Sequence, residues 1–251
     1  MSTSSGPEGT PLGDHPTPPP AQYTPLAAGN RVAYRTWGAP TAPPVVLLHG
    51  RTTNSTDWTD IAEALSATRR VYAPDIRGHG LSDWPGGYHY PQLVADIAEF
   101  IDALGLERVD LVGHSMGGAI ALQVAQSRPE KITRIVLEDA LPPFPLVPAR
   151  ATDPRPPQEE IDALDYDWDL IPATDEGANH PHPEWEAGLS KIAAPVLVVS
   201  GGEASFLSDA EQQKLTDLLP DARRVTIPVG HLIHRNDPDG FLAELRAFGI
   251  Y

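Results

Sequence analysis

One serine between two glycines constrains the fold more than any other feature of this chain. Residues 113–117 read Gly-His-Ser-Met-Gly, after the apolar run 109–112 and before a helical pattern that opens at Gly118. A sharp strand-to-helix turn would hold Ser115 clear of the backbone, and bulkier residues beside it would collide with the strand and the helix. The helix start would also place backbone N–H groups next to the serine. The segment therefore predicts a nucleophilic serine, which needs a base to react.

Length and composition are those of one folded α/β domain, or at most two small ones. The chain has 251 residues, of which 41% are apolar. It contains no apolar stretch long enough to span a bilayer. Residues 1–22 are rich in Ser, Gly, Pro and Thr and lack the basic start and apolar block of a secretory signal, so we expect a disordered leader there.

Acidic residues outnumber basic ones by 34 to 18, which gives a net charge of −16. Such a field repels phosphate groups, so we expect neither nucleic acid nor a membrane surface as a partner, and a small-molecule substrate instead. The chain has no cysteine, which excludes disulfides, thiolate catalysis and cysteine-bound metals and is typical of a cytoplasmic protein. The oligomeric state stays open.

Apolar periodicity alternates between strand and helix along most of the chain. Strands are predicted at residues 31–37, 45–48, 70–73, 109–112, 132–137, 195–199 and 224–227. Helices are predicted at residues 58–65, 93–104, 117–126, 209–219 and 240–248. This alternation predicts an α/β fold with a mostly parallel, doubly wound sheet.

The alternation breaks between Leu141 and Glu186, where proline and acidic residues accumulate. This stretch is too long for an ordinary connection, so residues 141–186 are predicted to form a lid with one or two short helices. Residues 23–140 and 187–251 would then form the core. The lid carries Trp168 and Trp185, which either pack the lid onto the core or roof an apolar pocket above Ser115.

Three further motifs follow predicted strands: His49-Gly50-Arg51, the run from Asp75 to Ser82, and Val229-Gly230-His231. With the serine motif, their order and spacing resemble the α/β-hydrolase superfamily from about Val32 to Phe248. The resemblance implies that Ser115 is the nucleophile and His231 the general base, with no cofactor. It also implies an oxyanion hole formed by the backbone N–H groups of Arg51 and Met116.

The third member of the expected triad departs from the usual pattern. Most of the superfamily carries an aspartate after the strand at 195–199, but residues 200–206 here contain only Glu203 as an acid. Some members are similar to this chain in carrying the acid at the end of the preceding sheet strand, where Asp139 lies. Asp139 is therefore assigned as the acid. Glu203, Glu138 and Asp209 are the alternatives, although Asp209 is expected to begin a helix capped by Ser208.

The remaining histidines have weaker functional interpretations. His234 lies three residues after His231 and is the rival base. His49, His79 and His114 are interpreted as structural, hydrogen-bonding residues. His180 and His182 form a pair in the lid, but no third ligand is evident, so no metal site is predicted.

The sequence thus predicts a cofactor-free serine hydrolase that acts on an ester, lactone or thioester of a small hydrophobic substrate. Two alternatives stay open. The same triad could cleave a carbon–carbon bond next to a ketone or rearrange a natural-product intermediate, or the fold could bind a ligand without chemistry. Enzymes of this fold that use a carboxylate nucleophile are a poor match because position 115 is serine.

Overall fold

A computed structural model describes residues 16–251, so most of the predicted leader lies outside the described residues. Residues 16–21 contain no helix or strand. Gln22, the last residue of the predicted leader, begins the first strand. Among residues 16–251, no helix is both long and apolar enough to cross a membrane.

An eight-stranded sheet forms the centre of the molecule, with the order β1-β2-β4-β3-β5-β6-β7-β8. Strands β3 to β8 run parallel, and β1 and β2 pair antiparallel at one edge. Each predicted strand is present, and its ends differ from the predicted ones by at most two residues. Strand β1 was not predicted. The strands are β1 Gln22–Pro25, β2 Arg31–Trp37, β3 Pro44–Leu48, β4 Arg70–Pro74, β5 Val109–His114, β6 Ile132–Glu138, β7 Val196–Ser200 and β8 Ala222–Thr226.

Both faces of the sheet are buried, which explains why its central strands are continuous apolar runs. In β3, Val46 and Leu48 join one apolar cluster, while Val45 and Leu47 join the other. This alternation follows from the two-residue period of a strand. The mostly parallel, doubly wound α/β sheet is the fold class that the sequence predicted.

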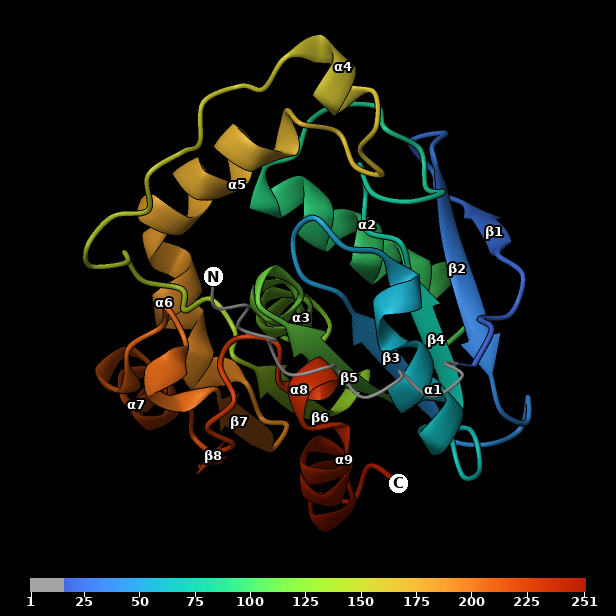
Figure 1. Cartoon of the computed structure of the whole chain (residues 1–251). Coiled ribbons are helices and arrows are strands. Elements are labelled where there is room, and N and C mark those ends of the chain that lie inside the picture. The colour runs from blue at the N-terminus through green and yellow to red at the C-terminus, as the bar shows by residue number, and fades with distance from the viewer. Residues whose placement is uncertain (1–15) are drawn as a thin grey trace, which may run out of the picture.

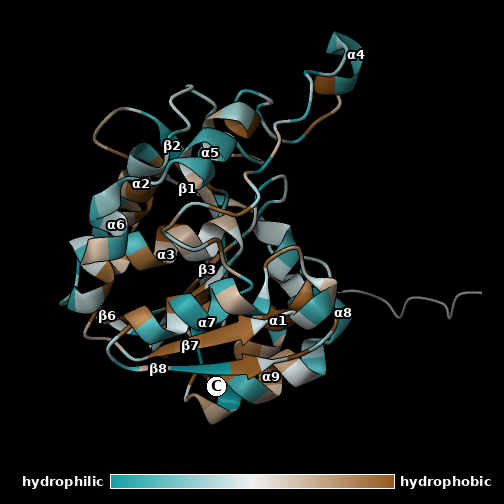
Figure 2. Cartoon of the chain, turned by 90° about the vertical axis from the view of Figure 1, so that its left-hand side faces the viewer, coloured by the Kyte–Doolittle hydropathy of each residue, from teal (hydrophilic) through white to brown (hydrophobic). Residues whose placement is uncertain are grey.

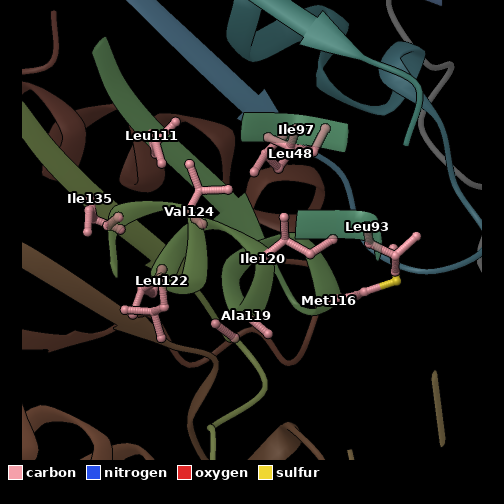
Figure 3. Close-up of a cluster of buried hydrophobic side chains, with 14 of the residues drawn as sticks. Leu48, Leu93, Ile97, Leu111, Met116, Ala119, Ile120, Leu122, Val124 and Ile135 are labelled. Atoms are coloured by element: carbon pink, nitrogen blue, oxygen red, sulfur yellow. The ribbon is translucent and has the colours of Figure 1, made fainter. Parts of the chain in front are cut away.

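Helices cover the two faces of the sheet (Figure 1). Helices α2 and α3 pack on one face, where Leu93, Ile97 and Ile120 belong to the same apolar cluster as the strand residues Leu48 and Leu111 (Figure 3), and α1 and α9 pack on the other. The helices are α1 Thr59–Leu65, α2 Tyr90–Ala103, α3 Met116–Ser127, α4 Gln158–Ile161, α5 Leu170–Asn179, α6 Pro183–Gly188, α7 Asp209–Leu218, α8 Ile233–Asn236 and α9 Pro238–Ala247, with 3-10 turns at Ser55–Trp58, Leu189–Lys191 and Gly202–Ala204.

The stretch between β6 and β7 contains α4, α5 and α6 and no strand of the sheet. Helix α4 stands away from the body of the molecule and buries none of its residues (Figure 2). The segment after α4 docks on the loop that follows β4, where Gly80 N donates to Asp165 O at 2.6 Å and Asp167 N donates to Gly78 O at 2.8 Å. These backbone contacts fasten the inserted stretch to the core.

Candidate active site

Ser115 lies at the turn between β5 and α3 in a strained backbone conformation, with φ 52° and ψ −115°. The flanking glycines are required by close backbone contacts. A methyl group on Gly113 would lie 2.5 Å from Gly117 O, and one on Gly117 would lie 2.3 Å from Leu48 O. The local sequence therefore permits a turn that larger residues would block.

Asp139 follows β6 and is fully buried, with a φ of 42°. Its Oδ1 accepts a hydrogen bond from Gly201 N at 3.0 Å, and its Oδ2 accepts one from the Ser205 hydroxyl. The same Oδ2 lies 2.7 Å from His231 Nδ1. The carboxylate is thus held by the loop after β7 and oriented toward the imidazole, which fixes a proton on Nδ1.

His231 and Ser115 line the same cavity. The backbone oxygen of His231 accepts a hydrogen bond from His114 Nε2 at 2.9 Å, and the Phe206 ring lies 4.5 Å from the imidazole centre. The Ser115 hydroxyl has no hydrogen-bond partner among residues 16–251. Because Nδ1 carries the proton that faces Asp139, the other ring nitrogen of His231, Nε2, is free of a proton and can accept one.

The alternative acids lie elsewhere. Glu203 is exposed in a 3-10 turn, and Glu138 binds His234 rather than His231. Asp209 begins α7 and pairs with Arg224. Ser208 caps this helix in a reciprocal capping box with Glu211, as the sequence predicted.

His234, the rival base, lies in a second, separate cluster of buried charges. Its Nδ1 is 2.8 Å from Glu138 Oε1, and its Nε2 is 3.2 Å from Asp57 Oδ1. The Trp58 ring stacks on the imidazole with centroids 4.3 Å apart. Burial alone would lower the pKa of His234, but the two carboxylates outweigh it and raise the pKa to about 9. The imidazole is therefore a buried cation, which cannot accept a proton from Ser115.

The other buried histidines are neutral, because burial lowers their pKa values. His49 Nε2 accepts a hydrogen bond from Ile76 N at 2.9 Å, so its Nδ1 donates to Gly50 O. Burial lowers the pKa of His114 to about 4 and that of His79 to about 3. His180 and His182 are exposed. No group of three or more acidic or histidine side chains that could hold a metal ion occurs in the described part of the chain.

A cavity of about 550 Å³ lies above Ser115. Trp168 lines it, as the roof interpretation requires. Trp185 does not line it, although its ring packs against the ring of the lining residue Tyr90, with centroids 5.4 Å apart. The lining side chains include apolar, acidic and basic groups, namely Arg51, Thr52, Thr53, Tyr90, His114, Ser115, Met116, Leu141, Arg150, Asp153, Tyr166, Trp168, Ile171, Thr174, Asp175, Ala178, Phe206, His231, Leu232 and Arg235.

The side chain of Arg51 points from the end of β3 toward helix α5. Its Nη1 lies 2.6 Å from Asp175 Oδ1 and 3.2 Å from Thr174 Oγ1. Asp175 and Arg150 were missed from the sequence because they belong to the stretch for which only short helices were predicted. The one available signal, the helical spacing of Leu170, Thr174 and Ala178, contains too few apolar residues to stand out.

Comparison with known proteins agrees with this architecture. Residues 43–169 match the model of the family described as alpha/beta hydrolase fold. The chain belongs to the alpha/beta hydrolase family. A 2-hydroxy-6-oxo-2,4-heptadienoate hydrolase of Pseudomonas putida is 45% identical over 103 residues, which are 39% of this chain and 37% of that protein. This relative is named as a hydrolase.

Two further relatives support the same assignment. A 3-hydroxybutyrate-oligomer hydrolase of Cupriavidus necator is 38% identical over 117 residues, covering 45% of this chain and 40% of that protein. The match with this chain thus covers about two fifths of the length of each of these two curated relatives. An alpha/beta hydrolase fold protein of Chitinophaga pinensis has a TM-score of 0.78 at 26% identity, with 94% of this chain and 98% of that chain covered.

Proposed function

We propose that this chain is a serine hydrolase in which Ser115, His231 and Asp139 form the catalytic triad. The observation that carries the proposal is the 2.7 Å contact between His231 Nδ1 and the buried Asp139 carboxylate, because His231 lines the same cavity as Ser115. The carboxylate keeps the imidazole in the tautomer that can accept a proton at Nε2. No cofactor is needed for this chemistry.

The reaction would proceed through an acyl-enzyme. Ser115 Oγ attacks the carbonyl carbon of the substrate while His231 takes the hydroxyl proton, and the carbonyl oxygen becomes an oxyanion. Collapse of this intermediate expels the leaving group, which receives the proton from His231. Water, activated by the same imidazole, then releases the acid and regenerates Ser115.

The oxyanion hole would consist of the backbone N–H groups of Met116 and Arg51. Met116 begins α3, and the first N–H groups of a helix have no partner within it. Arg51 follows β3, next to the serine turn, and its side chain is occupied with α5. Each such donor typically contributes about 3 kcal/mol to the stability of the transition state.

The unpaired Ser115 hydroxyl is compatible with this role. Catalytic hydrogen bonds are often long without substrate and tighten when the reactive complex forms. A strained serine backbone supports the same interpretation, because strain of this kind clusters at reactive sites.

The proposed substrates are esters, lactones or thioesters with a small apolar body. Trp168, Ile171 and Phe206 supply apolar surface in the cavity. Both curated relatives are named as hydrolases, which supports a hydrolytic reaction. The carbon–carbon hydrolase alternative would use the same triad but would break a carbon–carbon bond next to a ketone, so its leaving group is carbon instead of the oxygen or sulfur of an ester, lactone or thioester.

Turnover of p-nitrophenyl acetate tests this function. We expect hydrolysis by the wild-type chain and its loss in Ser115→Ala, with the melting temperature preserved. Hydrolysis that persists in Ser115→Ala would overturn the proposal. Absence of turnover in a chain whose Ser115 is still labelled by a fluorophosphonate would favour the carbon–carbon alternative, and absence of both would favour a ligand-binding protein.

A further inference from the structure

Two guanidinium groups share one buried carboxylate in the wall of the Ser115 cavity. Asp175 Oδ1 lies 2.6 Å from Arg51 Nη1 and 3.1 Å from Arg150 Nε, and the Asp175 side chain is only 2% exposed. All three residues line the cavity. Because two positive charges face one negative charge, this part of the wall carries an excess positive charge.

Both arginines are held in place by helix α5. The Asn179 side chain accepts a hydrogen bond from Arg150 N at 2.7 Å and donates one to Arg150 O at 2.8 Å, so the backbone of Arg150 is bound in both directions. Arg51 is fixed by Asp175 and Thr174 of the same helix. A fixed guanidinium loses little entropy when a ligand arrives, which favours binding.

Two further charged side chains near this wall are Arg235, which pairs with Asp57, and Asp153, which also lines the cavity. Asp153 partly offsets the positive charge, but it is exposed to solvent, which screens it, and it forms no ion pair with any described residue. The two Nη groups of Arg150 likewise have no acceptor within residues 16–251. Burial, and then the neighbouring Arg51, lower the pKa of Arg150, so an incoming anion would relieve an unfavourable charge.

We propose that this cavity selects substrates that carry a free carboxylate, which Arg150 binds through its two Nη groups with Arg51 nearby. The planar guanidinium fork matches a carboxylate in two parallel hydrogen bonds. Phe206, whose ring lies 5.4 Å from the Arg150 guanidinium, and Trp168 would enclose the apolar body. The inference rests on the proposed function and narrows its substrate class to anionic esters, lactones or thioesters.

Two p-nitrophenyl esters that differ only in charge test the selection. The mono-p-nitrophenyl ester of adipic acid carries a terminal carboxylate, and p-nitrophenyl hexanoate has the same chain length without it. We expect the kcat/KM ratio of adipate ester to hexanoate to exceed about ten in the wild type and to fall about tenfold in Arg150→Gln. Arg150→Lys should retain part of the ratio, because it keeps the charge and loses the fork. A ratio of one or less in the wild type, or an unchanged ratio in Arg150→Gln, would overturn the inference.

Arg155→Gln is the matched control, because Arg155 lies in the same inserted stretch and forms an exposed pair with Asp169. Its ratio should equal that of the wild type. Ser115→Ala measures the background hydrolysis of each ester.

A binding measurement separates failure of this inference from failure of the proposed function. Isothermal titration calorimetry with adipate, on Ser115→Ala and on the double variant Ser115→Ala/Arg150→Gln, requires no turnover. We expect adipate to bind the first at least tenfold more tightly than the second, and added salt to weaken the binding. If neither ester is hydrolysed but this difference is found, the catalytic proposal fails and the carboxylate site stands. Equal affinities would contradict the site itself.

Discussion

Asp139 accepts a hydrogen bond from the Nδ1–H of His231, and the proposed mechanism depends on this single contact. An asparagine there can offer its amide N–H to Nδ1, which moves the ring proton to Nε2 and leaves no base for Ser115. We expect Asp139→Asn to lower kcat by on the order of 10⁴, measured with p-nitrophenyl acetate.

Glu203→Gln is the control for this substitution, because Glu203 is exposed and also lies in the loop after β7. Its kcat should stay within about twofold of the wild type, as expected for a surface change. A near-normal rate in Asp139→Asn together with a large loss in Glu203→Gln would reverse the assignment of the acid.

The sequence indicated some members of the site and not others, for physical reasons. Asp139 could be selected because the loop after β7 lacks aspartate, and the structure brings it to His231, although its catalytic role stays a prediction. The sequence could not show which of Trp168 and Trp185 lines the Ser115 cavity, because an aromatic side chain predicts burial but does not indicate the surface against which it packs. Arg150 gave no signal, since its cavity position depends on a hydrogen-bonded amide 29 residues away.

At the scale of secondary-structure elements, the serine turn depends on the absence of a side chain at Gly117. A methyl group there would lie 2.3 Å from Leu48 O and 2.6 Å from His49 O, which are backbone atoms of the central sheet and its loop. We expect Gly117→Ala to reduce the free energy of unfolding by about 3 kcal/mol or more, measured by urea denaturation.

Gly87→Ala is the comparison, because Gly87 is exposed with a φ of 69° and open space around its Cα. This change introduces backbone strain without a collision and should cost about 1 kcal/mol. Equal losses in both variants would contradict the idea that contact with β3 makes Gly117 necessary.

Helix α5 is attached to the core through Asp175. Replacing its carboxylate leaves two arginines without their shared counterion, which is costly for buried charges. We expect Asp175→Asn to accelerate amide exchange in α5 by about tenfold or more while strand β5 stays protected. Arg155→Gln, which removes an exposed ion pair from outside α5, should leave exchange unchanged. No acceleration in α5 would show that apolar packing alone attaches the helix.

The strands could be predicted more completely than α5. Strands such as β3 and β7 are buried on both faces and therefore appear in the sequence as unbroken apolar runs. Helix α5 buries Thr174 and Asp175 on the side where a typical amphipathic helix has apolar residues, and it has a proline in its first turn. Its burial is stabilised by ion pairs, which apolar periodicity does not reveal.

At the scale of the whole molecule, His234 links stability to pH. Facing it are Glu138, Asp57 and His114, with Arg235 bound to Asp57. Its pKa rises from 6.5 to about 9 on folding, so the folded protein holds this proton more tightly than the unfolded chain. The resulting stability is fully present below pH 6.5 and is lost as the pH rises through about 9.

We therefore expect the melting temperature of the wild type to fall by several degrees between pH 7 and pH 10. His234→Gln should be less stable at pH 7 and should show a smaller decrease over the same range. His180→Gln, at an exposed histidine, should follow the wild type. An identical pH dependence in His234→Gln and the wild type would contradict a buried imidazolium.

Fluorophosphonate labelling reports directly whether His231 activates the Ser115 hydroxyl. We expect one covalent adduct, mapped by peptide mass spectrometry to Ser115, that forms at least a hundredfold more slowly in His231→Gln and is absent in Ser115→Ala. Labelling at the wild-type rate in His231→Gln, or no adduct on the folded wild-type chain, would contradict this activation.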